Sequence, residues 1–503
     1  MSLRQGVAFL QALRDGREIW LDGERVEDVT AHPQLRGAAL TIAELYAMQH
    51  RPDRQDRLSF VVDEESGERV GYSHIQPRTI DDLRRRREMI KLWADENGGM
   101  LGRTPDFMNL MFAGYAAAHE YFAQGDPVFG ENIRRYHDTL RRADLCLTHT
   151  LVHPQRDRST AAPVASEAEN AARVVKETDA GAVIRGARML ATLAPFADEL
   201  AVVPSISRFP PDTEEAKPFA VAFCLPMATP GLRFICRKSL TPPGGRVIDY
   251  PLSARLDEMD CVAIFDDVLV PWERMFIYRN PALVAGITQA GPGHALVQSS
   301  IKDLAKAEFL LGIAYNLAES INVLQFPNVQ NNLREMITVT EMVRAAVLAA
   351  EHDPVPGPGG TIVPNPRYLG QERFYFLESF PRLLEIVRTL GAGGLMMTPG
   401  EAEVRGARAA DIDRYYQAAS LPADRRIELF RLAQDAACSG FAGRNVLYER
   451  FFAGDPWRLG SLAAANYALR DQVKERVWDF LRRSREWDAR LGVTQSRSDG
   501  SAR

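Results

Sequence analysis

Apolar and polar positions divide the chain into three long stretches, and the first of them, residues 1–145, has a mainly helical pattern. Residues 79–99 (TIDDLRRRREMIKLWADENGG) put Thr79 and Asp82 in the spacing of a capping box and end in paired glycines. Residues 106–125, which follow a turn at GRTP, are apolar around most of a helical surface. A surface of this kind indicates a helix that is buried between neighbouring elements.

The pattern changes after about residue 145. Short apolar runs separated by proline and glycine predict an antiparallel barrel or sandwich. Helical periodicity then returns in segments long enough for a bundle, and the DPVPGPGG segment, residues 353–360, is interpreted as a loop inside that bundle. The predicted fold is therefore α+β and multidomain. Its parts are an N-terminal helical domain (1–145), a central antiparallel β-barrel (146–276), a C-terminal helical bundle (277–490) and a disordered tail (491–503).

The overall composition is that of an ordinary soluble globular protein. The 503 residues carry a net charge of -5, with 46% apolar and 25% charged residues, so nothing points to nucleic acid. The RRRRE cluster at residues 84–88 is flanked by acidic residues and is interpreted as a solvated helix face. No apolar run reaches the ~18 residues that a membrane span requires.

Cysteine and histidine usage argues against metal or disulfide chemistry. The five cysteines are odd in number, widely spaced and free of any CxxC pair, which favours buried free thiols in a reducing cytoplasm. Of the nine histidines, the nearest pair, His149 and His153, lacks a neighbouring carboxylate or cysteine cluster. Dinucleotide fingerprint, phosphate-loop, HExxH and GxSxG motifs are absent from the sequence. We therefore expect a cytoplasmic protein without a metal.

Two segments carry candidate chemistry with two interpretations each. In GRTPDF, residues 102–107, Arg103 either pairs with Asp106 at the surface or turns its guanidinium toward a cavity, where it suits a phenolate or carboxylate oxygen. In the run that contains His149, this histidine is either a satisfied core residue or a reactive one. The HPQRDRS segment that begins at His153 supplies groups for phosphates, or else forms an ion-paired loop.

Two further segments are singled out by their turns. Residues 176–192 predict two strands joined at Asp179–Gly181, with the Thr192 hydroxyl at the end of the second. His294 follows a Gly-Pro-Gly turn at the start of a long helix. The positive end of the helix dipole favours a neutral, proton-accepting imidazole there, although helix capping is an equally common role for such a residue.

In combination these segments resemble the oxygenase component of the two-component 4-hydroxyphenylacetate 3-monooxygenase family, over residues 5–455. The segments that carry the resemblance are DGREIWLDGERVEDVTAHP, GRTPDF, THTLVHPQRDRS, ETDAGAVIRGARMLAT, FDDVLVPWERMFIYRN and SGFAGRNVLYER. The resemblance implies an acyl-CoA dehydrogenase-like fold and a homotetramer or homodimer. It also implies FADH2 delivered by a separate NAD(P)H:flavin reductase, O2 as cosubstrate, and ortho-hydroxylation of a phenol through a C4a-hydroperoxyflavin.

The resemblance also implies roles for individual residues. Arg103 and His149 would contact the phenol oxygen, beside Phe107, and Ser205 would hold the distal group of the substrate. The residues implied for the flavin are Gln155, Arg156, Asp157, Arg158, Thr192, Ser439, Gly440 and Gly443. His153 gains no role, and no metal is implied.

Departures from the family pattern keep the substrate open. Phe107 replaces a tyrosine, Ile206 removes a hydroxyl beside Ser205, and His294 occupies the position of a catalytic histidine in related chlorophenol and nitrophenol monooxygenases. The chain thus has two candidate bases, His149 and His294. The second activity that these departures suggest is oxidative removal of a para halide or nitro group.

Functions of two different classes also stay open. The 4-hydroxybutyryl-CoA dehydratases resemble this family in fold, but they require cluster-binding cysteines near GRTPDF and near the His294 helix, and this chain lacks them there. The other alternative is a non-catalytic protein that binds flavin or acts as a scaffold.

Overall fold

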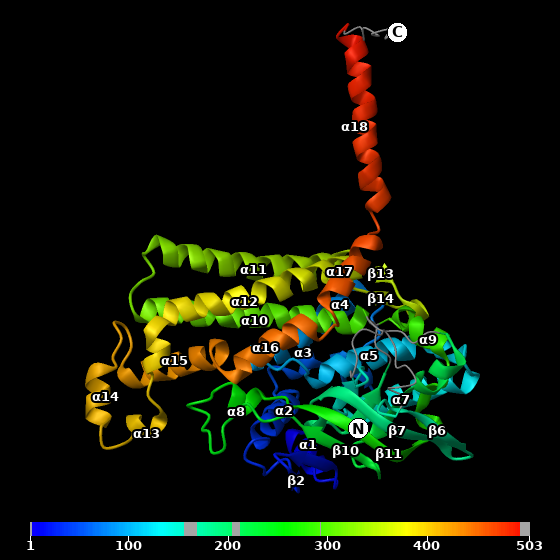
Figure 1. The fold of residues 1–503 in the computed structure, drawn as a ribbon, viewed down its shortest axis with the longest axis horizontal. Coiled ribbons are helices and arrows are strands. Elements are labelled where there is room, and N and C mark those ends of the chain that lie inside the picture. Colours follow the sequence, from blue (N-terminus) through cyan, green and yellow to red (C-terminus); the bar gives the residue numbers. More distant parts are fainter. Residues whose placement is uncertain (1–2, 155–168, 204–211, 292, 493–503) are drawn as a thin grey trace, which may run out of the picture. The chain divides into compact units, whose positions relative to one another are not determined.

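The computed structural model describes residues 3–154, 169–203, 212–291 and 293–492, and Figure 1 draws the course of the chain. The chain divides into two compact units, Met1–Phe452 and Ala453–Arg503. The tail predicted to be disordered lies almost wholly outside the described residues, and so do five predicted site residues. These five are Gln155, Arg156, Asp157, Arg158 and Ser205.

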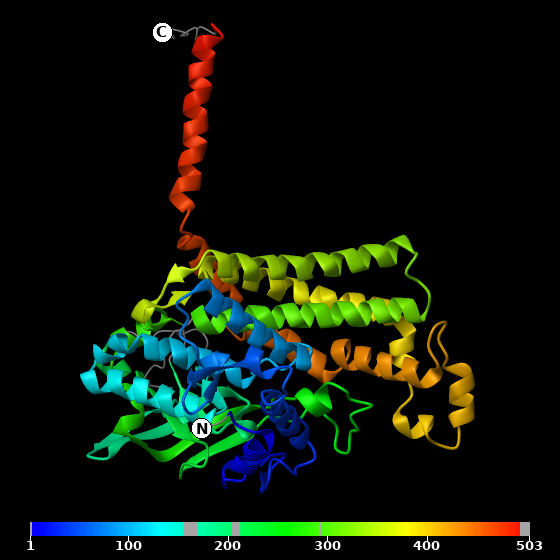
Figure 2. The ribbon, with the colours of Figure 1, turned by 180° about the vertical axis from the view of Figure 1, so that it is seen from behind.

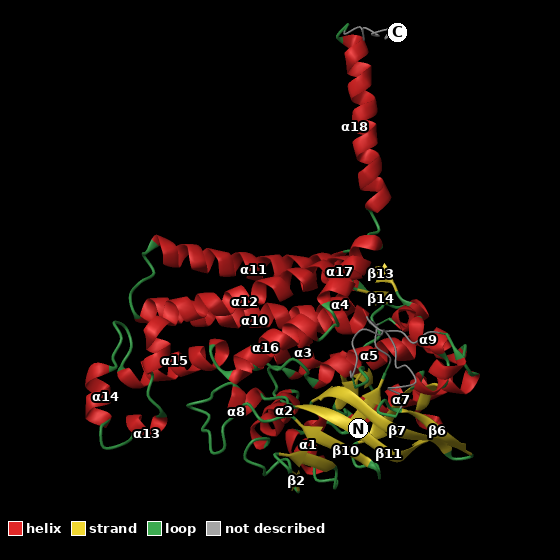
Figure 3. Ribbon diagram, in the orientation of Figure 1, coloured by secondary structure: helices red, strands yellow, loops and turns green. Residues whose placement is uncertain are grey.

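Helices dominate the first 145 residues, as the pattern predicts (Figure 3). They are α1 (Gly6–Ala12), α2 (Arg36–Met48), α3 (Gln55–Leu58), η1 (Tyr72–His74), α4 (Ile80–Glu96), α5 (Pro105–Ala117), α6 (His119–Ala123) and α7 (Pro127–Ala143). The predicted capping box is present. The Thr79 hydroxyl accepts a hydrogen bond from the Asp82 amide at 3.1 Å, and the Asp82 carboxylate accepts one from the Thr79 amide at 3.0 Å. A cap of this kind stabilises a helix by about 1 kcal/mol.

Two sheets form the strand-rich middle of the chain. The six-stranded sheet has the order β2 (Glu24–Val26), β1 (Glu18–Leu21), β10 (Leu232–Cys236), β11 (Asp260–Pro271), β7 (Gly181–Thr192) and β6 (Arg173–Thr178). The four-stranded sheet has the order β12 (Met275–Ile277), β9 (Ala222–Pro226), β8 (Glu199–Val202) and β5 (Leu147–Thr150). Two small hairpins pair β3 (Ser59–Asp63) with β4 (Glu68–Gly71), and β13 (Val355–Pro356) with β14 (Ile362–Val363).

The strand pairing corrects part of the sequence prediction. The hairpin expected over residues 176–192 is confirmed as the antiparallel pair β6 and β7. However, β1 pairs with β10 and β5 pairs with β8 in parallel, so the expectation of an entirely antiparallel arrangement is wrong. β1 and β2 also come from the stretch predicted to be mainly helical, because pairing with a distant strand leaves no local signal in the sequence. Among the described strands, no ladder joins the two sheets into a closed barrel.

The helical bundle after residue 277 is present, and its three longest helices lie side by side (Figure 2). They are α10 (Gly293–Ser320), α11 (Pro327–His352) and α12 (Pro366–Met397), and α15 (Ala423–Ala437) and α16 (Gly440–Phe451) pack against α12. The DPVPGPGG segment connects α11 to α12 within the bundle, as predicted, and it contains the short elements β13 and η6 (Pro358–Gly360). The remaining short helices of the first compact unit, Met1–Phe452, lie before and within the bundle. They are η2 (Ala194–Phe196), η3 (Glu214–Phe219), α8 (Ser253–Leu256), η4 (Trp272–Arg274), α9 (Pro281–Ala285), η5 (Ile287–Ala290), α13 (Glu401–Val404) and α14 (Ala409–Tyr415).

Helix α5 lies at the junction of these layers. It packs against α10 of the bundle, against α7, and against β5 of the smaller sheet. Every residue of α5 is buried, which confirms that the apolar stretch 106–125 begins with a buried helix. The residues at its N-terminal end therefore face both the bundle and the sheets.

The arginine cluster on α4 is only partly the solvated face that the sequence suggests. Arg84 and Arg85 are exposed and pair with Asp81, as expected. Arg86 is instead buried, with 1% of its surface exposed. Position 86 falls on the helix face of Leu83, and that face packs against α10, so the prediction is wrong for this residue.

The cysteines are free thiols, as predicted. Cys146, Cys224, Cys236 and Cys261 are buried. Cys438 is exposed, which corrects the expectation that all five are buried. It is the residue that follows α15, so it lies where the buried face of that helix ends.

The second unit contains α17 (Pro456–Ala465) and α18 (Arg470–Arg490). Exposed apolar residues recur along one side of α18 at spacings of four, three and seven residues. They include Val473, Val477, Phe480 and Trp487. Among the helices of the described residues, none has the length and apolar character that crossing a membrane requires.

Candidate active site

Arg103 lies in the turn before α5 and is buried, with 6% of its surface exposed. Its backbone N–H donates to Glu258 Oε2 at 2.8 Å, and its Nη1 donates to the Tyr448 hydroxyl at 2.6 Å. The guanidinium carbon lies 3.9 Å from the centroid of the Phe107 ring. Among the described residues Nε has no hydrogen-bond partner. Of the two interpretations of the sequence, surface pairing with Asp106 is therefore wrong.

His149 lies on β5 and contacts the same aromatic ring. Its imidazole stacks on Phe107 with ring centroids 5.4 Å apart and an interplanar angle of 28°. Burial, and then the nearby Arg103 guanidinium, lower the pKa of His149 well below its ordinary value. The imidazole is therefore neutral at physiological pH, and one of its ring nitrogens carries a lone pair that can accept a proton.

The contact between Phe107 and both basic groups follows from local structure. Pro105 is the first residue of α5, where a missing N–H costs nothing, and Thr104 is the N-cap that separates the helix from Arg103. Phe107 is then in the first turn, at the end of the helix that faces β5. The strand presents His149 to that end, and the turn presents Arg103.

The remaining residues of the GRTPDF motif form a separate polar contact. The Thr104 hydroxyl donates to the Asp106 carboxylate and accepts a hydrogen bond from Gln298 Nε2 at 3.0 Å. Asp106 is fully buried, and burial raises its pKa to about 7. This contact fixes the start of α5 against α10, which is the helix that carries Gln298.

Thr192 belongs to an ion network that links the larger sheet to α16. The Thr192 hydroxyl donates to Asp260 Oδ1 at 2.7 Å, and Arg444 Nη2 donates to the same oxygen at 2.7 Å. Arg444 also pairs with Glu258, the carboxylate that accepts from the Arg103 backbone. Although burial opposes ionisation, the guanidiniums of Arg444 and Arg237 hold the pKa of Asp260 well below its ordinary value.

Ser439, Gly440 and Gly443 lie at the start of α16. The Ser439 hydroxyl caps the helix by accepting from the Ala442 amide at 3.3 Å. Gly440 and Gly443 are exposed and lie three residues apart, on one face of the first turn. A Cβ at Gly443 would meet no atom of the described residues within 4 Å, so a flat ligand has room to approach the backbone there.

His294 occupies a different part of the site region. It is the second residue of α10 and is buried, and its Nδ1 lies 3.0 Å from Arg86 Nη1. Its ring packs on Gly114, where a Cβ would come within 2.8 Å of Cδ2. Gly114 is seven residues from Phe107, about two helical turns along α5. Arg103 and His149 thus share Phe107, whereas His294 lies against the far end of α5.

Several residues in this region were not predicted from the sequence. Tyr448 holds Arg103, Glu258 and Asp260 anchor the loop and the sheet, and Arg86 contacts His294. Of the residues that hold the site, only Tyr448 and Arg444 could have been found from the sequence. They lie four residues apart within the SGFAGRNVLYER segment, on one face of a helix that also contains the predicted glycines.

A buried charge network lies directly behind Tyr448. Glu449 accepts from Lys302 Nζ at 2.6 Å, from Lys306 Nζ at 2.5 Å and from Arg373 Nη1 at 3.0 Å. Lys302 Nζ also lies 5.1 Å from the centroid of the Tyr448 ring. The network therefore supports the residue that holds Arg103, and it joins α10, α12 and α16.

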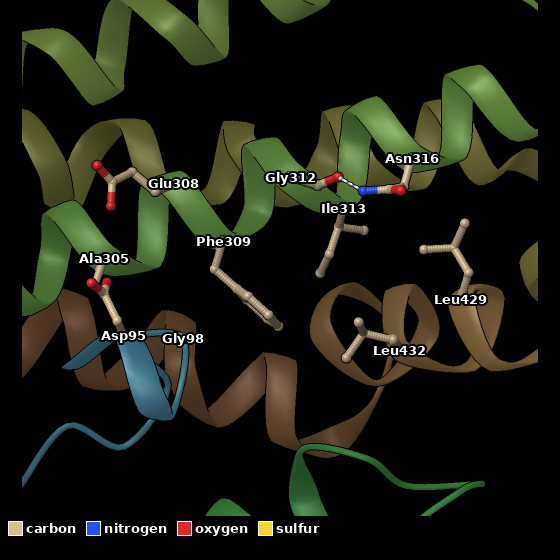
Figure 4. Close-up of a pocket in the computed structure, with 10 residues that line it drawn as sticks. All are labelled: Asp95, Gly98, Ala305, Glu308, Phe309, Gly312, Ile313, Asn316, Leu429 and Leu432. Carbon is tan, nitrogen blue, oxygen red and sulfur yellow. Dashed lines mark hydrogen bonds between the residues drawn. The ribbon is translucent and has the colours of Figure 1, made fainter. Parts of the chain in front are cut away.

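A hollow on the bundle contains none of the predicted site residues. It lies between α10 and α15, beside the end of α4, as Figure 4 shows. Phe309, Ile313, Leu429 and Leu432 supply its apolar lining, and Glu308 and Asp95 lie at one side. We interpret it as a gap in helix packing, because its lining has neither a basic group nor a histidine.

Within the described ranges, no group of three or more histidine, cysteine, aspartate or glutamate side chains could hold a metal ion. The functional groups of the described site are a buried guanidinium, two histidines, an aromatic ring and an open glycine surface.

Comparison with known proteins identifies the class of this site. Residues 5–277 match the family described as 4-hydroxyphenylacetate 3-hydroxylase N terminal, and residues 290–482 match its C-terminal counterpart. The 4-hydroxyphenylacetate 3-monooxygenase oxygenase component of Thermus thermophilus is 40% identical, over 96% of this chain and 98% of its own. The 4-nitrophenol 2-monooxygenase oxygenase component of a Rhodococcus species is 30% identical, over 90% of this chain and 86% of its own.

A solved structure supports the same assignment. The crystal structure of a 4-hydroxyphenylacetate 3-monooxygenase oxygenase component with FAD and 4-hydroxyphenylacetate matches with a TM-score of 0.90 and 40% identity. The match covers 96% of this chain and 99% of that one. The fold and the two matched regions define an oxygenase-component architecture. The chain belongs to the 4-hydroxyphenylacetate 3-hydroxylase family.

Proposed function

We propose that this protein is the oxygenase component of a two-component monooxygenase, which uses FADH2 and O2 to hydroxylate a phenol ortho to its hydroxyl group. The observation that carries this proposal is the contact of Arg103 and His149 with one aromatic ring, Phe107. A phenol beside that ring would meet a proton acceptor and a fixed cation. These are the two groups that ring hydroxylation requires from the protein.

The described residues fit a bound flavin. The exposed glycines of α16 leave an open surface, and the orphaned Nε of Arg103 is a buried donor without an acceptor among the described residues. Thr192 and Ser439, with Gly440 and Gly443, would hold the cofactor, and Gln155–Arg158 belong to the same proposal. Reduced flavin with O2 supplies an electrophilic oxygen atom when it is bound.

The protein's own part is to make the phenol electron-rich. His149 is neutral and accepts the phenolic proton at one ring nitrogen. Arg103 is always charged, and it stabilises the resulting phenolate oxygen with N–H groups that Tyr448 holds in position. Phe107 gives the substrate ring an apolar surface to lie on, and Ser205 would hold its distal group.

Exclusion of water is a second requirement, because water promotes release of peroxide instead of oxygen transfer. The residues around Phe107 on α5 are buried and mostly apolar. Asp106 is sequestered against Thr104, so the polar groups that contact the Phe107 ring are Arg103 and His149. This arrangement favours transfer of the oxygen atom to the phenol.

The second candidate activity is oxidative removal of a para halide or nitro group, which the sequence suggests through His294. His294 packs on Gly114, about two turns along α5 from the Phe107 ring that Arg103 and His149 contact, and this favours the first activity. The substrate is expected to be 4-hydroxyphenylacetate or a similar phenol. Because Phe107 lacks a hydroxyl group, the phenol oxygen would depend on Arg103 and His149 alone.

An acyl-CoA dehydrogenase-like arrangement is part of the proposal, with residues 146–276 as a barrel-like layer between the domains 1–145 and 277–490. The Phe223 and Phe265 rings, 6.1 Å apart, connect the two sheets and support this arrangement. A cytoplasmic location is supported by the free cysteines.

The proposed partners are a flavin reductase and further copies of this chain, in a homotetramer or homodimer. The exposed apolar stripe of α18 supports self-association, because spacings of four, three and seven residues place its members on one helix face, as in a helix-helix seam. Light scattering should give a mass of two or four chains, and Val477→Glu together with Phe480→Glu, both on this stripe, should lower it.

The activity test supplies reductase, NADH and FAD with 4-hydroxyphenylacetate, or with a chlorophenol or nitrophenol in parallel. A catechol product from 4-hydroxyphenylacetate is the expected result. Halide or nitrite release without a catechol would favour the second activity. Flavin binding without any product would indicate a non-catalytic flavin-binding protein.

A further inference from the structure

The two candidate histidines differ in the hydrogen bonds of their rings. Within the described residues, no hydrogen bond reaches the His149 imidazole. His294 has one such partner, because Arg86 Nη1 lies 3.0 Å from Nδ1. Both histidines are buried, so bulk water does not supply hydrogen-bond partners to either ring.

The identity of this partner fixes the chemical form of His294. An arginine guanidinium has only N–H donors and accepts nothing. At 3.0 Å, Nδ1 of His294 must therefore be the acceptor and carry no proton. The ring is then neutral and has its proton on Nε2, since a ring protonated at both nitrogens would place two donors against each other.

The surroundings hold both members of the pair in position. Arg86 lies on the face of α4 that packs against α10, and 1% of its surface is exposed. Gly114 of α5 closes the other side of the imidazole. Arg86 is the charged group that acts on His294, while Asp82 and Glu351 act in turn on Arg86.

We propose that Arg86 is a positioning residue that locks His294 in its Nε2–H tautomer, so that His294 donates a hydrogen bond in the site and His149, not His294, accepts the proton. Its role in the site rests on the proposed function. The tautomer itself does not, because it follows from the Arg86 contact alone.

An Nε2–H donor would bind an oxygen acceptor, either a carbonyl of the flavin or a carbonyl or carboxylate oxygen of the substrate. The base for the phenol would then be the histidine that shares Phe107 with Arg103. Burial and the adjacent Arg86 also lower the pKa of His294 well below its ordinary value, which agrees with a ring that stays neutral.

The direct test is a nitrogen NMR spectrum of full-length protein with ¹⁵N-labelled histidine, recorded without flavin or substrate from about pH 6 to 9, across the usual histidine range. His294→Gln and His149→Gln assign the two residues by loss of signal. His294 should show a protonated Nε2 and a bare Nδ1 throughout. A proton on Nδ1, or titration within this range, would overturn the proposal.

Variants of α4 test the role of Arg86. Arg86→Met should allow the second tautomer or a titration to appear, whereas Arg85→Met, on the exposed face of the same helix, should leave the spectrum unchanged. An unchanged spectrum in Arg86→Met would contradict the lock. If Arg86→Met does not fold, the wild-type spectrum still decides the tautomer, and Arg86→Lys, which retains a donor, should preserve it.

Binding and kinetic constants show whether His294 donates its hydrogen bond to the flavin or to the substrate. His294→Leu should raise either the Kd for FAD or the KM for the phenol by about tenfold, the effect of one hydrogen bond. His294→Gln, which keeps a donor at a similar reach, should stay within about threefold of wild type. Loss of the acidic limb of the pH–rate profile in His294→Leu would make His294 the base, and no change in either constant would remove its donor role. If no phenol is hydroxylated, the proposed function fails while the spectrum still reports the tautomer.

Discussion

The Arg103 guanidinium carbon lies 3.9 Å from the centroid of the Phe107 ring. This contact joins the charged residue of GRTPDF to the aromatic residue four positions later, and His149 of β5 stacks on the same ring. A cation over a buried aromatic face is worth about 2 kcal/mol. The contact therefore holds the Arg103 guanidinium beside the Phe107 ring. Its Nε has no hydrogen-bond partner among the described residues.

Replacing Arg103 with lysine should lower phenol hydroxylation by about tenfold to a hundredfold, because a lysine cannot keep both the Tyr448 hydrogen bond and a second donor in one plane. The rate of product formation from 4-hydroxyphenylacetate measures this. Arg134→Lys is the matched control, since Arg134 forms an exposed pair with Glu131 on α7. Equal losses in both variants would show that Arg103 has no special role.

Replacing His149 with glutamine should lower the yield of hydroxylated product by about a hundredfold or more, since the phenol loses its proton acceptor. Oxidation of reduced flavin should continue and release hydrogen peroxide. The ratio of product to reduced flavin consumed is the quantity to measure, with exposed His352→Gln as control. An unchanged ratio would remove His149 from the mechanism.

Replacing Glu449 with glutamine should destabilise the protein by about 3–5 kcal/mol, the range for breaking a buried ion pair. Lys302, Lys306 and Arg373 would lose the carboxylate that they share. Urea unfolding measures the change. The exposed pair of Glu428 with Arg425 supplies the control, because Glu428→Gln should cost less than about 1 kcal/mol. A similar effect at both sites would contradict a structural role of the network.

Replacing Asp106 with asparagine should change how stability depends on pH. Burial raises the pKa of Asp106 from 3.8 to about 7, so the folded state binds this proton more tightly than the unfolded state does. The stability that this tighter proton binding adds to the folded state is fully present below about pH 4, and it is lost as the pH rises to about 7. It is worth up to about 4 kcal/mol.

The free energy of unfolding of Asp106→Asn, relative to wild type, should therefore increase between about pH 4 and pH 7. Urea titrations at several pH values measure this difference, and Asp413→Asn on the exposed face of α14 serves as the control. A constant difference across the range would show that Asp106 is ionised in the folded protein.

Local signals allowed much of the fold to be predicted. The Thr79 cap, the β6–β7 hairpin and the loop between α11 and α12 depend on residues that are close in sequence, so each left a readable pattern. Long-range pairing left none. The parallel contact of β1 with β10 and the burial of Arg86 depend on where distant elements pack.

The site shows the same division. The sequence identified Arg103 and His149 as candidates, but two interpretations of each stayed open without their surroundings. The partner that decides the position of Arg103, Tyr448, lies far away in the chain. The partner that decides the form of His294, Arg86, looks like part of a solvated cluster when it is read in sequence alone. The roles of the two histidines therefore differ because of the residues that contact each of them in the fold, which their residue type alone does not reveal.

The most direct test of the proposed function is an isotope measurement. The protein is supplied with reduced FAD, 4-hydroxyphenylacetate and ¹⁸O₂, and the product is analysed by mass spectrometry. We predict a catechol that carries one ¹⁸O atom ortho to the original hydroxyl group. Complete oxidation of the reduced flavin, with O2 reduced to hydrogen peroxide and with 4-hydroxyphenylacetate and other phenols unchanged, would contradict it, and so would a product without ¹⁸O.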